Sequence, residues 1–331
     1  MYLNNSAVLE ELDFLPGFTI PVIILLAVEI ILGIASSCAV LLIYWNKRHI
    51  RSVATKFIAN LALIDLVICC VCIPFTVALL AVFPRNSAIL CCCHEAVTSA
   101  LRNASIITLL LICYDRYKSV TNPFVLRLSH RKAKRALFLV WSITFASLAI
   151  PFAEWNRASS FHSRISACIT LFSREQNPFY FRLYYLPLFI LACMILLPAY
   201  LRISEAAFSR VHIQAILMAK TSLVVPASTA AQRWNASAIR QKEWKIAKMT
   251  GAVVCSICGL WLPYTTLTFA MYFLKPSNLL ARLEFAFLTF GYFNCVLNPL
   301  LYAFTKEKFR TAFLRTLPFK KKITFENARS F

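Results

Sequence analysis

Two short polar sequences stand at the ends of apolar segments and hold residue types suited to switching between partners. Asp115-Arg116-Tyr117 places an arginine guanidinium beside a carboxylate that can neutralise it. Asn298-Pro299, followed by Tyr302, combines an amide, a helix-bending proline and a hydroxyl that can move between water and protein partners. Because arginine can exchange one carboxylate for another through paired hydrogen bonds, this chemistry suits conformational switching.

Side chains used in catalysis are present, but they do not form a catalytic set. His94-Glu95 matches the start of the zinc-protease pattern His-Glu-x-x-His, yet Thr98 stands where the second histidine is needed. No pairing of a nucleophile with a base emerges along the chain. The sequence therefore predicts that the protein is not an enzyme.

The composition indicates a membrane protein rather than a soluble domain. Hydrophobic residues make up 60% of the 331 residues, the mean hydropathy is +0.67, and only 5 residues are glycine. Seven runs lack charged residues, and most approach the roughly 20 residues that cross a hydrocarbon core. These runs are 30–46, 66–84, 103–114, 136–153, 183–201, 249–274 and 285–305. The third belongs to a longer helix, about 88–118, interrupted by Glu95 and Arg102, so we predict an all-α protein with seven membrane spans.

Basic residues are distributed unequally between alternate connections. Of the 35 Lys and Arg residues, 27 fall on one side and 7 on the other, and the remaining one, Arg102, lies inside a span. This imbalance predicts a cytoplasmic basic side and an extracellular N-terminal tail over 1–17. We expect a multi-pass plasma-membrane protein without a secretory signal peptide, with Asn4 in a glycosylation sequon. The net charge of +21 then favours contact with anionic lipids and not with nucleic acid.

Motifs in the successive runs give the chain a family resemblance. Asp65 directly precedes the second run and belongs to the second predicted span, while Trp141 lies in the fourth run, Pro187 in the fifth and Trp261-Leu262-Pro263 in the sixth. Together with the two sequences described first, they resemble rhodopsin-like G-protein-coupled receptors over about residues 18–317. The resemblance implies a seven-helix receptor domain over 18–305, followed within 306–331 by a short amphipathic eighth helix and a tail. It also implies heterotrimeric G proteins and an extracellular ligand of unknown identity as partners.

Four short segments narrow the resemblance to one orphan receptor of that family, whose third cytoplasmic loop and tail are longer than those of this chain. The segments are 92–96, 151–154, 300–305 and 321–326.

The resemblance assigns switching roles to the motif residues. Arg116 would be held by Asp115 and by Glu243, locking the sixth span closed; the alternative is an ordinary ion pair at the rim. Trp261 would rotate about the bend at Pro263, or it would simply fill the core, while Pro299 and Tyr302 would move in the seventh span. Ile195 stands where the family has a tyrosine in the fifth span, which argues against the complete active-state network.

A buried cation site is a second implication of the resemblance. Asp65 is a carboxylate inside a span, and Ser105, Asn294 and Asn298 occupy positions where the family holds a sodium ion. Ser37 replaces an asparagine of that set. The alternative is that Arg102, one helical turn outward from Ser105, neutralises Asp65, so sodium and Arg102 are both expectations at this point.

The outer ends of the spans hold the candidate ligand residues His94, Glu95, Thr98, Arg102, Glu154, Trp261 and Tyr292. Thr98 stands where amine receptors of the family have an aspartate, so an amine requires Glu95, His94 or Glu154 as a substitute. Tyr292 stands where light receptors have their lysine, which excludes that function.

Arg102 and His94 each leave two interpretations open. Arg102 either binds an anionic ligand or pairs with Asp65 or Glu29, and the internal pair is favoured because an unpaired buried cation is costly. For His94 we expect a solvated rim side chain rather than a proton sensor.

Four cysteines fall on the predicted outer side, where a disulfide is chemically favoured. They are Cys91, Cys92, Cys93 and Cys168. The family resemblance selects Cys91 as the partner of Cys168.

A transporter or channel is the alternative class of function, because such proteins also use acids inside spans, here Glu29 and Asp65. They often contain internal repeats or paired broken helices, and we find no repeat in this chain.

Overall fold

A computed structural model describes residues 16–46, 52–81, 88–121, 128–149, 186–221, 251–270, 274 and 278–305. Nearly all of these residues are helical, and the sixth predicted span is a helix over Gly251–Ala270. The other elements are α2 (Pro16–Asn46), α3 (Val53–Val67), the π-helix η2 (Ile68–Cys72), α4 (Ile73–Ala81), α5 (Ala88–Thr121), α6 (His130–Ser147), α9 (Leu186–Thr221), α11 (Asn278–Tyr292) and α12 (Asn294–Thr305). The predicted eighth helix within 306–331 and most of the N-terminal tail lie outside the described residues.

Five of the described helices are long and apolar enough to cross a membrane. They are Gly17–Asn46, Val53–Ala81, Cys93–Lys118, Leu188–Glu205 and Gly251–Ala270. The helices of the fourth and seventh predicted spans do not meet this standard individually. The fourth, α6, begins with the basic stretch 130–135, and the seventh is divided at Phe293 into α11 and α12 of 15 and 12 residues.

Two helices begin earlier than the charge-free runs predicted. The run at 30–46 belongs to a helix that starts at Pro16, and the run at 66–84 belongs to one that starts at Val53. Glu29 and Asp65 stand directly before these two runs and set their predicted beginnings. In the structure both helices continue through these acids, whose side chains are only 1% and 0% exposed. An acid that faced lipid would be costly within a span, but these two acids face the interior of the bundle, so the helix need not end at them.

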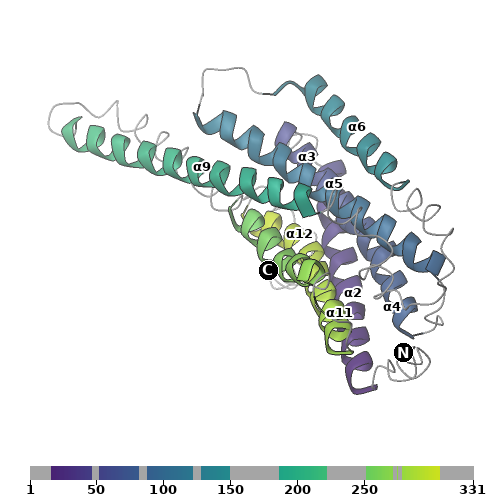
Figure 1. Cartoon of the computed structure of the whole chain (residues 1–331). Helices are drawn as coiled ribbons and strands as arrows, with labels where there is room; N and C mark the ends of the chain where they lie inside the picture. The colour runs from purple at the N-terminus through teal and green to yellow at the C-terminus, as the bar shows by residue number, and fades with distance from the viewer. Residues whose placement is uncertain are drawn as a thin grey trace, which may run out of the picture.

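The second span is one continuous helix made of α3, η2 and α4 (Figure 1). It begins at Ser52, whose hydroxyl accepts a hydrogen bond from the Thr55 N–H while the Ser52 N–H donates to the Thr55 hydroxyl. The π-helical turn at Ile68–Cys72 ends two residues before Pro74, which has no N–H to continue the α-helical ladder. A local change of winding is the usual response to such a gap.

Helix α5 lies at the centre of the bundle and packs against α3, α6 and α9, while α2 packs against α3 and α12 (Figure 1). Large apolar side chains on the outer helices are instead exposed, as expected for surfaces in contact with lipid. The most exposed include Ile31, Phe138, Met194 and Leu279.

A short hydrogen-bond chain joins three helices at Asn60. The Trp141 indole Nε1–H donates to Asn60 Oδ1 at 2.9 Å, and Asn60 Nδ2 donates to the Thr108 hydroxyl at 3.0 Å. Each of these polar groups is therefore satisfied, and α6, α3 and α5 are held in register at this depth.

Candidate functional site

The charged motif of α5 lies within its last two turns. Arg116 Nη2 is 2.9 Å from Asp115 Oδ2, and both side chains are partly buried. Tyr117 is the next residue of the same helix. The predicted second acid, Glu243, lies outside the described residues, and Tyr302 belongs to α12 without a described side chain. The structure thus shows the Asp115–Arg116 pair, and the lock with Glu243 stays a prediction.

Trp261 is the buried centre of an aromatic group that joins two helices. It is 4% exposed, two residues before Pro263, and its ring meets Tyr264 and Tyr292 edge-on, with centroids 6.0 and 6.2 Å apart. The indole also packs on the backbone of Gly291, where an added Cβ would lie 2.8 Å from Trp261 Cζ3. Only glycine allows this approach of the sixth-span helix to α11.

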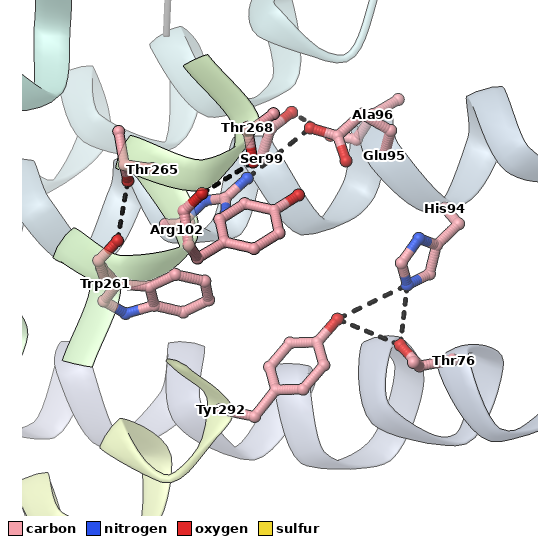
Figure 2. A network of polar contacts seen from close by, with 11 residues as sticks. Thr76, His94, Glu95, Ala96, Ser99, Arg102, Trp261, Thr265, Thr268 and Tyr292 are labelled. Carbon is pink, nitrogen blue, oxygen red and sulfur yellow. Dashed lines mark hydrogen bonds and ion pairs between the residues drawn. The ribbon is translucent and has the colours of Figure 1, made fainter. Parts of the chain in front are cut away.

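Arg102 reaches the same aromatic group from α5. Its guanidinium carbon lies 4.7 Å from the centroid of Trp261 and 5.1 Å from that of Tyr264, distances suited to cation–π attraction. Nη2 of Arg102 is 3.6 Å from Glu95 Oε1, two helical turns earlier in α5 (Figure 2). The side chain is 2% exposed.

The acid that the structure places beside Arg102 is therefore Glu95. The sequence had suggested Asp65 or Glu29, and an ion pair of Arg102 with either is not found within the described part of the chain. Glu95 is well placed to pair with Arg102, because residues seven apart lie on one face of a helix and their side chains point the same way.

His94 is buried, so the expectation of a solvated rim histidine is wrong. Its side chain is 8% exposed, and Nε2 lies 2.8 Å from the Thr76 hydroxyl and 3.4 Å from the Tyr292 hydroxyl. The two hydroxyls are 3.1 Å apart, which closes a triangle of polar contacts between α4, α5 and α11 (Figure 2). Phe75 covers the imidazole edge-on.

Asp65 lies deep among oxygen-bearing side chains. Asn298 Nδ2 donates to Asp65 Oδ2 at 3.4 Å, and Asn294 lies one turn earlier on the same helix. Four buried oxygens of the predicted set have no hydrogen-bond partner among the described residues. They are Asp65 Oδ1, Ser105 Oγ, Asn294 Oδ1 and Asn298 Oδ1, and the same holds for Oγ of Ser37. Buried polar atoms are normally satisfied, so these oxygens fit a hard cation.

Several predicted residues cannot be placed against the site. Glu154, Cys168 and Asn4 lie outside the described residues, and Cys91 belongs to α5 without a described side chain. The described residues contain no group of three or more His, Cys, Asp or Glu side chains that could hold a metal ion.

Three residues of the described helices were not singled out by the sequence reasoning. Tyr264 directly follows Pro263, and Glu284 precedes Tyr292 by two helical turns, a spacing that could have indicated a shared face of α11. Tyr200 of α9 packs its ring on Gly251, whereas Ile195, at the position where the family has tyrosine, is 48% exposed.

The chain is similar in sequence to known receptors. The family model "7 transmembrane receptor (rhodopsin family)" matches residues 36–302. G-protein coupled receptor 22 of Rattus norvegicus is 26% identical over 91% of this chain and 79% of its own length. The protein of that name from Danio rerio is 27% identical over 86% of this chain and 71% of its own length. Histamine H2 receptor of Canis lupus familiaris is 28% identical over 90% of this chain and 79% of its own length. The predicted resemblance to the family and to G-protein coupled receptor 22 is thus confirmed.

Proposed function

Because this chain belongs to the rhodopsin family of seven-transmembrane receptors, we propose that Arg116 at the end of α5 is its contact with a heterotrimeric G protein. The family makes the chain a multi-pass membrane receptor for G-protein signalling, which excludes the transporter, channel and enzyme alternatives. The observation that supports the contact is the partly buried Arg116–Asp115 pair, held at 2.9 Å where it can exchange partners.

In the proposed resting state Arg116 is shared between Asp115 and Glu243, so that the sixth span stays against α5. Activation breaks the contact with Glu243, and the sixth span moves about the bend at Pro263 and opens a cleft for the G protein. The cation–π contact between Arg102 and Trp261 supports this proposal because it joins the outer half of α5 to the bending helix.

We place the receptor in the plasma membrane with its N-terminus outside. The 27 basic residues then lie on the cytoplasmic side, where anionic lipid headgroups attract them. No role in binding nucleic acid is proposed, because lipid contact accounts for the positive charge.

The proposed contact is tested by measuring ligand-free dissociation of each G-protein subtype in cells. The native chain is expected to dissociate at least one subtype above receptor-free cells, and Arg116→Ala is expected to remove that signal because the guanidinium is lost. Glu243→Lys is expected to raise the signal, since it repels Arg116. All variants are compared at equal surface expression. A signal that survives in Arg116→Ala, or native and Glu243→Lys chains that activate no subtype, would contradict the proposal.

We also propose that Asp65, Ser105, Asn294 and Asn298 hold a sodium ion, which would neutralise the buried carboxylate. Their hard oxygens fit this ion, and Ser37, at the position of an asparagine of the family's set, has a further buried oxygen without a hydrogen-bond partner among the described residues. The pairing of Arg102 with Glu95 supports sodium over Arg102 as the cation near Asp65.

Asp65→Asn is expected to abolish any dependence of receptor stability on sodium, because a neutral amide attracts the ion far less than a carboxylate does. The unfolding midpoint of purified receptor in detergent is measured in sodium chloride and in potassium chloride of the same ionic strength. The native chain is expected to unfold at a higher temperature in sodium, and Asp65→Asn at the same temperature in both. An equal midpoint for the native chain in both salts would rule out the site.

A further inference from the structure

Two thiols from different helices meet between the fifth and sixth spans. Sγ of Cys193 in α9 lies 3.6 Å from Sγ of Cys258 in the sixth-span helix, and either thiol can donate a hydrogen bond to the other. The two cysteines are 65 residues apart along the chain, so the packing of the helices is what brings them together. A disulfide needs its sulfurs about 2.05 Å apart, so rotation of the side chains and a slight shift of the helices have to close about 1.5 Å.

The thiol pair is supported by the core on one side and reaches the lipid surface on the other. Cys258 packs against a small buried cluster formed by Cys113 of α5, Leu196 of α9 and Val254 of the sixth-span helix. Both thiols of the pair are only half-buried, and Met194, next to Cys193, is 69% exposed. The pair is therefore held in place by packing and can still be reached by a small molecule in the bilayer.

We infer that Cys193 and Cys258 form a reversible disulfide when a peroxide reaches them, and that this bond fixes α9 to the sixth-span helix. The oxidant is either hydrogen peroxide from the water or a lipid hydroperoxide from the bilayer, because both carry the same O–O bond. The second half of the inference rests on the proposed function, since it takes the sixth-span helix as the moving part.

The peroxide accounts for all the electrons and protons of the reaction. One thiol sulfur attacks a peroxide oxygen, the O–O bond breaks, and the thiol proton leaves with the other oxygen as water or as an alcohol. The second sulfur then attacks the sulfenic acid, so the S–S bond forms, the S–O bond breaks, and water leaves with the second thiol proton. Two thiols are oxidised to one disulfide while one peroxide is reduced.

The position of Cys258 determines what the disulfide would restrain. Cys258 stands five residues before Pro263, about 7 Å along the helix and on the same side of the bend as Gly251. It thus belongs to the half of the helix that moves when the cleft for the G protein opens. Because a disulfide keeps its two Cα atoms within about 7 Å of each other, the bond would prevent that half from moving relative to α9.

The disulfide is tested by peptide mapping of the purified receptor in lipid nanodiscs. The receptor is incubated with cumene hydroperoxide, which enters the bilayer, or with hydrogen peroxide; free thiols are then blocked, and linked peptides are identified by mass spectrometry. The native chain is expected to yield a Cys193–Cys258 peptide that dithiothreitol separates, and Cys193→Ser and Cys258→Ser are expected to lose it. Cys255→Ser, which changes an exposed thiol of the same helix, is the matched control and is expected to keep it. Linkage by either peroxide supports the inference, and the faster one identifies the source of the oxidant.

The restraint is tested on the linked receptor by two further measurements. Its unfolding midpoint is expected to rise by about 4–10 °C, because the bond limits the freedom of the unfolded chain. Its ligand-free G-protein dissociation is expected to be lost, and dithiothreitol is expected to restore it. Cys193→Ser and Cys258→Ser, treated with the same peroxide, are expected to show neither change, which controls for oxidation at other sites.

Four results would overturn the inference. Two concern the bond: the native chain yields no linked peptide, or Cys258 is linked to a cysteine other than Cys193. Two concern the restraint: the linked receptor unfolds at the same temperature as the reduced one, or it dissociates the G protein as fully. Because the peptides and the unfolding midpoint are measured without a G protein, a failure of the disulfide is distinguishable from a failure of the proposed Arg116 contact.

Discussion

Gly291→Ala is expected to lower the free energy of unfolding by about 1–3 kcal/mol, the range usual for overpacking a filled core. The new Cβ would lie 2.8 and 2.9 Å from two carbons of the Trp261 indole, closer than carbon atoms pack. Trp261 cannot swing away easily, because Arg102, Tyr264 and Tyr292 surround a ring that is 4% exposed. The measurement is the unfolding midpoint of purified receptor in detergent.

Gly259→Ala is the matched control, because a Cβ added at Gly259 meets nothing within 4 Å while the gain in helix propensity is the same. Combining Gly291→Ala with Trp261→Phe is expected to recover much of the loss, since phenylalanine lacks the outer indole ring that collides. Equal midpoints for Gly291→Ala and Gly259→Ala would show that the indole is not held as tightly as its contacts indicate.

Arg102→Ala is expected to lower the free energy of unfolding by about 3–5 kcal/mol, the range found when one partner of a buried ion pair is removed. The variant leaves Glu95 without its cation and removes the guanidinium from the faces of Trp261 and Tyr264. Thermal unfolding of purified receptor again supplies the measurement, at a pH near neutrality where carboxylates ordinarily carry charge.

The control for this change is Arg202→Ala, which removes an exposed arginine of α9. Adding Glu95→Gln to Arg102→Ala is expected to restore part of the stability, because the double variant buries one charge fewer. If the double variant is as unstable as the sum of its parts, the Arg102–Glu95 pair is not coupled and the arginine contributes only packing. If the two single arginine variants unfold alike, Arg102 contributes no more to stability than an exposed arginine does.

The family motifs could be recognised from the sequence because the residues of each motif are close together along the chain. Asp115 and Arg116 are adjacent, and Trp261 and Pro263 are two residues apart, so their relation depends on one helix and not on how helices pack. Membrane-length apolar runs are similarly local, since crossing a hydrocarbon core is a matter of length and hydropathy. These signals predicted the fold class and the family that the comparisons confirm.

The predicted boundaries of the spans agreed less well with the helices of the structure, and Glu29 and Asp65 show the reason. A count of charge-free residues treats every acid as the end of a span, but these two lie inside helices with almost no exposure. Whether a charge ends a helix or is buried within it depends on the groups that surround it in three dimensions. The second span adds a π-helical turn before Pro74, which no count of hydrophobic residues indicates.

The sequence by itself determined that this is a helical membrane receptor with Arg116, Trp261, Pro263 and Asn298 at the family's motif positions. Only the tertiary structure decided that Arg102 pairs with Glu95 and stacks on Trp261 and Tyr264, that His94 is buried, and that Gly291 admits the indole. A buried charge takes whichever partner the packed helices bring within a few ångströms. Several acids along the chain could have served Arg102, so its partner is fixed by packing and not by spacing alone.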